Sequence, residues 1–153
     1  MLYVSTSRKP SVLARKLCRW LELLLGAECE NRGKRSLQEC VDRAEAKGFK
    51  RVLLVYEAFG NPRKLVFLER EKWLGKIVLS GVKLPEGKQS RVPEGVRGGV
   101  ALDGKGRDVL ALFGLAPGKG VVELVAGGGE VSFKVGGVPR GPVLVVAGVE
   151  VLG

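Results

Sequence analysis

The chain has 153 residues, a length typical of one domain, and 45% of them are hydrophobic, which is ordinary for a globular protein. Its 26 Lys and Arg against 16 Asp and Glu give a net charge of +10, which favours an acidic partner. It has no His, the commonest general base and metal ligand, and no apolar run of membrane-spanning length. We therefore expect a cytoplasmic protein that does not bind a membrane.

The charge is unevenly distributed along the chain. Residues 1–76 hold 17 Lys and Arg against 9 Asp and Glu, a net charge of +8. Residues 77–153 hold 9 against 7, a net charge of +2. The first half is therefore expected to form the contact with an acidic partner.

The apolar pattern predicts a strand at residues 2–6 and a helix at about 11–25. One face of this helix is a leucine stripe, formed by Leu13, Leu17, Leu21 and Leu24. Arg15 and Arg19 lie on the opposite, outward face. Pro10 suits a first helical position, and either Ser7 or Ser11 is expected to cap the helix.

A short strand is expected at residues 27–30, and a second helix begins after Ser36, because Ser36 and Glu39 match the capping box. Gly48 is expected to end this helix. The continuous apolar run at residues 51–57 predicts a strand that is buried on both faces. A turn at residues 60–62 and a strand at 65–69 follow. This order of strands and helices predicts helices packed on a mixed sheet, an α/β fold.

The second half is rich in Gly and Val and is expected to be strand-rich. Residues 73–84 predict one or two strands, residues 83–106 mostly loop, and residues 108–115 a short helix. The remaining apolar runs predict strands at residues 121–126, 131–135 and 143–152. Gly127, Gly128 and Gly129 are expected to connect the first two of these three strands.

Cys18, Cys29 and Cys40 lack the paired spacing of a zinc site. They are expected to be buried apolar residues, and a disulfide between two of them is the alternative. The chain has few Asn and Gln and one Met, a pattern typical of thermophiles, whose intracellular proteins sometimes carry disulfides.

Motifs for catalysis are missing from the sequence. The glycine-rich stretches do not match the phosphate-binding loop pattern, and no acidic cluster suits magnesium. No Ser or Cys has the signature of a nucleophile, and no His exists to activate one. We therefore expect no cofactor, no small-molecule substrate and no enzymatic activity.

Both predicted helices of the first half have basic entrances. Arg8 and Lys9 precede the first helix, and Arg32, Lys34 and Arg35 precede the second. The positive end of a helix dipole favours acids, so these cations indicate an external anion such as phosphate at both entrances. The alternative is that both stretches are solvated loops. Because loops that lead from strands into helices tend to share one edge of a sheet, both entrances are expected to line one surface.

Several stretches resemble the Brix domain in the order of that family. They are STSRKPS, NRGKRSLQE, VYEAFGNPRKLVFLE, LFGLAP and VVELVAGGGEVSFKVGG. Together they cover nearly the whole chain, and the compact archaeal Brix proteins are the most similar members. The resemblance implies a single Brix domain over residues 1–153. It also implies two related halves, each similar to the anticodon-binding domain of class IIa aminoacyl-tRNA synthetases.

The resemblance further implies a role in ribosome assembly, with binding to pre-ribosomal RNA or a guide RNA and contact with other assembly proteins. The residues expected to bind RNA are polar or basic: Ser7, Arg8, Lys9, Arg15, Arg19, Arg32, Lys34, Arg35, Asn61, Arg63 and Lys64. Tyr3, Tyr56 and Phe59 are the aromatic side chains placed to stack on bases, with core packing as the alternative. The rival function is a scaffold that docks a protein through the second half.

Overall fold

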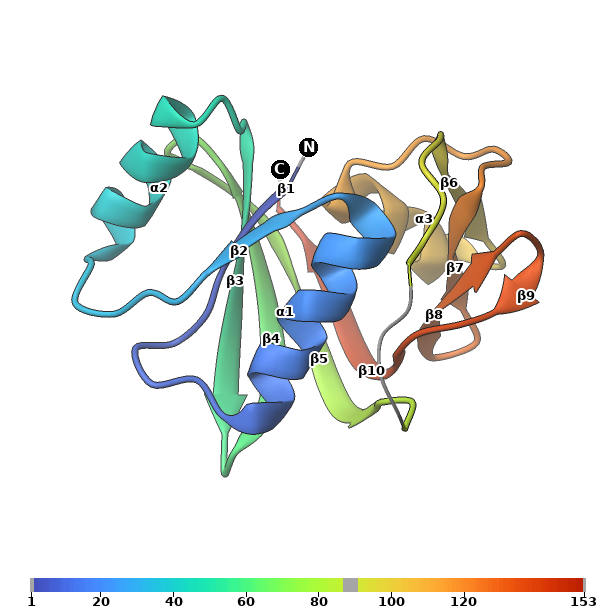
Figure 1. The fold of residues 1–153 in the computed structure, drawn as a ribbon, viewed down its shortest axis with the longest axis horizontal. Coiled ribbons are helices and arrows are strands. Elements are labelled where there is room, and N and C mark those ends of the chain that lie inside the picture. Colours follow the sequence, from blue (N-terminus) through green and yellow to red (C-terminus); the bar gives the residue numbers. More distant parts are fainter. Residues whose placement is uncertain (1, 87–90, 153) are drawn as a thin grey trace.

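The structure is a computed structural model that describes residues 2–86 and 91–152 of the chain (Figure 1). These residues form three helices and ten strands in one mixed sheet, which confirms the predicted α/β class. The helices are α1 (Val12–Leu25), α2 (Leu37–Ala46) and α3 (Gly104–Phe113). The strands are β1 (Leu2–Ser5), β2 (Glu28–Glu30), β3 (Arg51–Ala58), β4 (Asn61–Glu69), β5 (Lys72–Lys83), β6 (Arg97–Ala101), β7 (Val122–Gly127), β8 (Glu130–Val135), β9 (Val138–Pro139) and β10 (Val143–Val151).

The sheet has the spatial order β2-β1-β3-β4-β5-β10-β8-β7-β6, and β9 pairs with β8. β1 lies between β2 and β3 and is parallel to both, while β6 is parallel to β7. The other pairs are antiparallel. The carboxyl ends of β1, β2 and β3 therefore meet at one edge of the sheet.

The order of connections is the same on both sides of the central β5–β10 pair. In the first half, β1 leads through α1 to the parallel strand β3, and antiparallel β4 and β5 follow. In the second half, β6 leads through α3 to the parallel strand β7, and antiparallel β8 and β10 follow. β2 and α2 are additional in the first half, and β9 is additional in the second.

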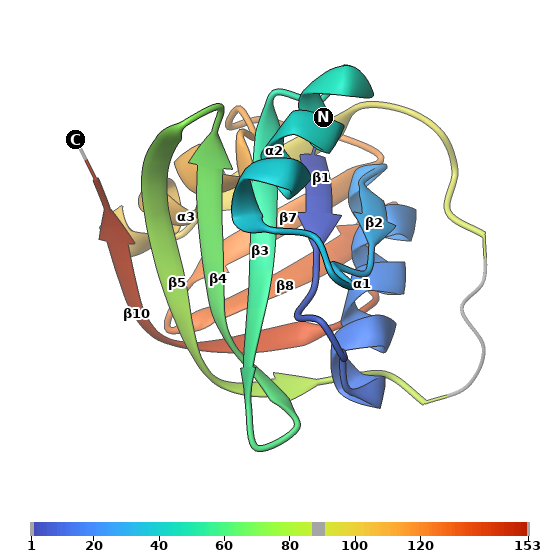
Figure 2. The ribbon, with the colours of Figure 1, turned by 90° about the vertical axis from the view of Figure 1, so that its left-hand side faces the viewer.

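The main hydrophobic core joins the two halves. Leu17 and Leu21 of α1 and Leu110 and Phe113 of α3 belong to the same buried cluster, which covers one face of the sheet. The ring of Phe113 meets that of Phe67 on β4 edge to face, with centroids 5.0 Å apart. α2 covers part of the opposite face in a smaller second core, and Figure 2 shows it in front of β1 and β3.

α1 begins and ends where local chemistry requires. The Ser11 hydroxyl accepts a hydrogen bond from the Ala14 N–H at 3.1 Å, so Ser11 rather than Ser7 is the N-cap. Pro10 precedes this cap, so the expectation that it is the first helical residue is wrong. Gly26 ends the helix in the left-handed conformation, with a φ of 68° that glycine adopts readily.

The capping box predicted for α2 is present. Ser36 accepts from the Glu39 N–H at 3.1 Å, and the Ser36 N–H donates to the Glu39 carboxylate at 3.2 Å. At the other end, Gly48 has a φ of 86°, and the Phe49 N–H bonds the Ala44 carbonyl at 2.9 Å. This is the Schellman arrangement that the sequence indicated at Gly48.

The expectation that residues 83–106 are mostly loop is wrong for its second part. β6 lies within it, and α3 begins at Gly104 after the N-cap Asp103, four residues before the predicted helix start. Both elements contain glycines, which weaken the sequence pattern of a strand or a helix. At Gly98 a glycine is needed, because a Cβ there would collide with the Gly118 carbonyl oxygen. Residues 87–90 of the expected loop lie outside the described residues.

Of the one or two strands expected at residues 73–84, the structure has one, β5, which ends at Lys83. The three cysteines are free, and the Cys29 thiol donates to the Cys18 carbonyl at 3.1 Å. The contact with Cys18, together with burial, raises the pKa of the Cys29 thiol above its ordinary value. None of the helices in residues 2–86 and 91–152 is long and apolar enough to cross a membrane.

Candidate nucleic-acid interface

Three connections of the first half lie at one edge of the sheet. They follow β1, β2 and β3, and Ser5 at the end of β1 pairs with both Glu30 on β2 and Leu54 on β3. The Thr6 N–H bonds the Glu30 carbonyl at 3.4 Å, so the first two loops begin side by side. In Figure 1 the loop after β1 and the β3–β4 turn lie at the same lower end of the sheet. We call residues 6–11, 31–36 and 59–60 the basic edge.

Five of the predicted cations are exposed and have no hydrogen bond, ion pair or ring contact with any residue that the structure describes. They are Arg8, Lys9, Arg15, Arg19 and Lys34. Arg8, Lys9 and Lys34 belong to the basic edge, and Arg15 and Arg19 lie on the outer face of α1. The sequence-based expectation that the two basic loops share one surface is consistent with this arrangement.

Arg32 and Arg35 instead support their own loop. The Arg32 guanidinium donates to the Arg35 carbonyl at 3.0 Å, and that of Arg35 donates to the Asn31 carbonyl at 3.2 Å. Both side chains are half-buried. They hold the shape of the loop that presents Lys34.

The N-terminal end of α1 already has an anion beside it, the Glu57 carboxylate. Its oxygens accept from the Ser7 hydroxyl at 3.0 Å and from the Ser11 N–H at 3.0 and 3.2 Å. The end of β3 therefore supplies a carboxylate beside the positive end of α1, and the external anion expected near Arg8 and Lys9 stays a prediction. Ser7 orients the loop through this contact with Glu57.

The entrance of α2 has its own acid as well. The hydrogen bonds with Ser36 lower the pKa of Glu39, which keeps this carboxylate charged beside the helix end. The external anion expected at this helix end likewise stays a prediction. Any phosphate at the basic edge would contact exposed side chains rather than a helix terminus.

The cations of the GNPRK stretch lie on a strand rather than in a turn. The two-residue turn is Phe59–Gly60, and β4 begins at Asn61, so the turn predicted at residues 60–62 is displaced. The Asn61 amide donates to the Phe59 carbonyl at 3.1 Å. Arg63 donates to the Ser80 carbonyl at 3.4 Å, and Lys64 lies 5.6 Å from the centre of the Tyr56 ring.

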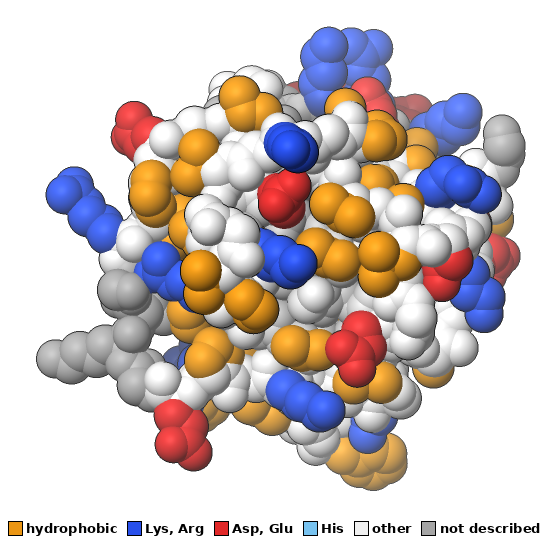
Figure 3. All heavy atoms as spheres, turned by 90° about the vertical axis from the view of Figure 1, so that its right-hand side faces the viewer, with side chains coloured by type: hydrophobic (Ala, Val, Ile, Leu, Met, Phe, Trp, Pro, Cys, Tyr) orange, Lys and Arg blue, Asp and Glu red, His pale blue; other side chains and the backbone are white. Residues whose placement is uncertain are grey.

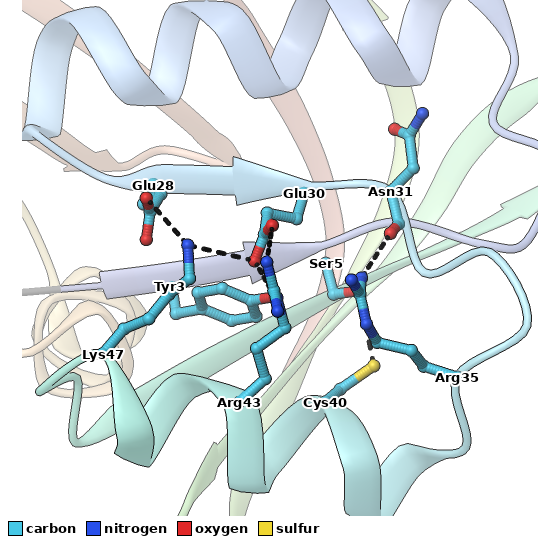
Figure 4. A network of polar contacts seen from close by, with 9 residues as sticks. All are labelled: Tyr3, Ser5, Glu28, Glu30, Asn31, Arg35, Cys40, Arg43 and Lys47. Carbon is cyan, nitrogen blue, oxygen red and sulfur yellow. Dashed lines mark hydrogen bonds and ion pairs between the residues drawn. The ribbon is translucent and has the colours of Figure 1, made fainter.

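A network of polar contacts fixes β2 and α2 on either side of the second basic loop (Figure 4). The Tyr3 hydroxyl donates to Glu30 at 2.6 Å, and Arg43 donates to both Glu30 oxygens at 2.7 and 2.8 Å. Lys47 lies 3.2 Å from Glu28 and 3.5 Å from Glu30. The hydrogen bonds from Arg43 are the largest of the effects that lower the pKa of Glu30 to about 2.

The three aromatic candidates have different environments. Tyr3 is fully buried and packs on Phe49 with ring centroids 5.9 Å apart, so its role is in the core. Tyr56 is half-buried beside Lys64. The Phe59 side chain is 99% exposed at the tip of the β3–β4 hairpin. Composition alone could not separate these three residues, because burial depends on the tertiary fold.

The second half has a different surface. Figure 3 shows the side of the molecule that includes β6 to β9, where hydrophobic side chains lie among charges of both signs. A hollow of about 510 Å³ at the start of α3 is lined by Asp103, Lys105 and Glu130 together with small and apolar residues. Asp103 accepts from the Gly128 and Gly106 N–H groups, which lower its pKa, so its carboxylate has a structural role. No group of acids and cysteines suited to a metal ion occurs among the described residues.

Comparisons with known proteins confirm the resemblance to the Brix family. A probable Brix domain-containing ribosomal biogenesis protein of Methanosarcina mazei is 39% identical over 79 residues, 52% of this chain and 46% of that protein. A protein of the same name from Pyrococcus horikoshii is 34% identical over 89 residues, 55% of this chain and 40% of that protein. These matches span less than half the length of either relative. No protein-family model matches the chain.

Two crystal structures share the fold over nearly the whole chain. An archaeal Imp4-like protein has a TM-score of 0.76 and 24% identity, with 99% of each chain covered. A probable ribosomal biogenesis protein from Aeropyrum pernix has a TM-score of 0.71 and 24% identity, with 95% of this chain and 94% of that chain covered.

Proposed function

Because the chain resembles the archaeal Brix proteins in sequence and fold, we propose that it is a non-enzymatic, RNA-binding factor of ribosome assembly. It acts in pre-rRNA processing and subunit assembly. Its partner is pre-ribosomal RNA or a guide RNA, together with other assembly proteins. The basic edge and the outer face of α1 form the RNA contact.

The observation that carries this proposal is the convergence of unpartnered cations. Parallel pairing of β1, β2 and β3 brings Arg8, Lys9 and Lys34 to one edge. Each lacks a hydrogen-bond or ion-pair partner among the described residues, so each is available to a phosphate. Most of the positive charge of the chain also lies in this half, as the net +8 of residues 1–76 shows.

The contacts at this edge favour recognition of phosphate and shape. Long cations on well-ordered loops bind the RNA backbone and carry little sequence information. The carboxylates near the edge, Glu57, Glu39 and Glu30, are bound to protein donors and so have structural roles.

The proposal also includes the predicted relationship between the two halves of the chain. The repeated order of connections supports two related halves, each similar to the anticodon-binding domain of class IIa aminoacyl-tRNA synthetases. The core shared by α1 and α3 supports a single domain over residues 1–153.

A charge-matched pair of variants tests the proposed interface. Replacing Arg8, Lys9 and Lys34 with Ala should weaken binding to a labelled RNA hairpin with single-stranded flanks. The slope of log affinity against log salt should fall by roughly 0.7 to 0.9 for each phosphate that the variant no longer binds. The control replaces the exposed Lys105, Lys119 and Lys134 of the second half and removes the same charge.

The proposed interface is correct only if the Arg8, Lys9 and Lys34 variant loses more RNA affinity than the control variant, and if its slope of log affinity against log salt also falls further. Equal losses would show that net charge alone attracts RNA. A wild-type protein without measurable RNA affinity would contradict the function itself.

One observation favours the rival function, docking of a protein partner. Val96, Leu102 and Val138 of the second half are apolar side chains that are 70%, 65% and 64% exposed. On this reading, substitution of these residues should abolish binding of an assembly protein while RNA affinity stays unchanged.

A further inference from the structure

Phe59 is an exposed aromatic side chain at the tip of the β3–β4 hairpin. Its side chain is 99% exposed, whereas Tyr3, the first aromatic residue of the chain, is fully buried. Burial usually stabilises an aromatic ring, so an exposed ring at a loop tip contributes almost nothing to folding. A binding role would account for its position.

The backbone at Phe59 is also unfavourable for this residue. Phe59 and Gly60 form a two-residue turn with φ values of 52° and 76°, both in the left-handed region. Asn-Gly or Gly-Gly suits such a turn, and a bulky residue there is strained. The β7–β8 turn follows this rule with Gly128 and Gly129. Folding alone would therefore favour Asn or Gly in place of Phe59.

The turn extends beyond the ends of β1 and β2, where the other two loops of the basic edge begin. Ser5 at the end of β1 is level with Leu54, and β3 continues four residues further to Ala58, roughly 13 Å at the usual rise of a strand. Glu57, two residues before the ring, binds Ser7 and Ser11 and so holds the loop of Arg8 and Lys9 beside the hairpin. An exposed ring and unpartnered cations thus occupy the same edge.

We propose that Phe59 stacks on an unpaired base of the bound RNA while Arg8 and Lys9 contact the adjoining phosphates. This inference rests on the proposed RNA-binding function and adds the class of ligand, a single-stranded segment. Stacking platforms beside cationic grooves are the usual means of binding single strands without a sequence code. An apolar protein groove would cover the ring but leave these cations unpaired, so RNA fits the edge better.

Phe59→Ala and Phe59→Trp test the stacking directly. The probes are a single-stranded RNA of about 12 nucleotides that contains 2-aminopurine and a duplex of the same length. Phe59→Ala should weaken single-strand binding roughly 5- to 150-fold, the change that corresponds to about 1–3 kcal/mol per stacked base. The salt slope and the duplex affinity of Phe59→Ala should stay unchanged. Phe59→Trp should retain both the single-strand affinity of the wild type and its quenching of 2-aminopurine.

Two further variants separate stacking from a change in folding and from general surface hydrophobicity. Phe59→Asn, which suits the left-handed turn, should raise the melting temperature and still lose single-strand affinity. Leu102→Ala removes another exposed apolar side chain, 65% exposed, in the second half and should leave RNA affinity unchanged.

The outcomes distinguish this inference from the function on which it rests. If Phe59→Ala binds as tightly as the wild type while the Arg8, Lys9 and Lys34 variant is weakened, stacking is wrong and RNA binding stands. Equal losses on single strand and duplex would also overturn stacking. A wild type that binds neither probe would overturn both proposals.

Discussion

Two carboxylates, Glu57 and Glu30, position the basic loops of this protein. Glu57 joins the end of β3 to the loop before α1 through Ser7 and Ser11. Glu30 joins β2 to α2 through a bidentate contact with Arg43. Both acids satisfy donors inside the protein, which leaves the exposed cations nearby without an internal partner.

Glu30 allows a prediction about pH at the scale of one residue. Its folded pKa of about 2 lies below the ordinary value of 4.5, so its stabilising effect is complete above about pH 4.5. The effect is lost as the pH falls from there toward 2. Glu30→Gln should lower the free energy of unfolding by about 1.5 kcal/mol at pH 7. Urea denaturation at pH 7 and pH 3 should show a smaller difference from wild type at pH 3.

The exposed Glu45 of α2 provides the control for Glu30. Its side chain has no hydrogen-bond or ion-pair partner among the described residues, so Glu45→Gln should have little effect at either pH. A Glu30→Gln effect that stays constant between pH 7 and pH 3 would contradict the assigned pKa.

At the scale of elements, the sequence predicts the ends of α1 and α2 well, because their signals are local. Ser36 and Glu39 are three residues apart, and both hydrogen bonds of the capping box form. Ser11 and Gly26 similarly bound α1. The acid at the entrance of α1 could not be predicted, because Glu57 lies 46 residues from Ser11 and reaches it only through the sheet.

Glycine-rich elements were the least predictable. β6 contains Gly98 and Gly99, and the first turn of α3 contains Gly104 and Gly106, so neither has the usual propensity pattern. Gly98 and Gly106 are required by close contacts with the carbonyl oxygens of Gly118 and Ala126, respectively. Such contacts exist only after the sheet has formed, and a local pattern cannot reveal them.

The capping box of α2 allows a prediction at this scale. Ser36→Ala should lower the free energy of unfolding by about 0.5–2 kcal/mol, because the Glu39 N–H loses its acceptor. Ser36→Thr keeps a capping hydroxyl and should be nearly neutral. Chemical denaturation followed by circular dichroism measures both variants, and equal stabilities for wild type and Ser36→Ala would show that the cap contributes nothing.

At the scale of the whole molecule, one core and an uneven charge distribution bear on the proposed contact with RNA. α1 and α3 pack into the same hydrophobic cluster, so the two halves are held together. The charge of the halves nevertheless differs, with a net +8 in residues 1–76 and +2 in residues 77–153. On the proposed function, a molecule with one shared core and one basic edge should therefore approach RNA in one orientation.

The central claim is that the basic edge, rather than the second half, contacts RNA. Ultraviolet crosslinking of the wild-type protein to RNA in extract of its native cells, followed by mass spectrometry of the crosslinked peptides, measures this directly. We predict crosslinks in three peptides: one that contains Arg8 and Lys9, one that contains Lys34 and one that contains Phe59. Crosslinks confined to residues 97–140 would contradict the claim.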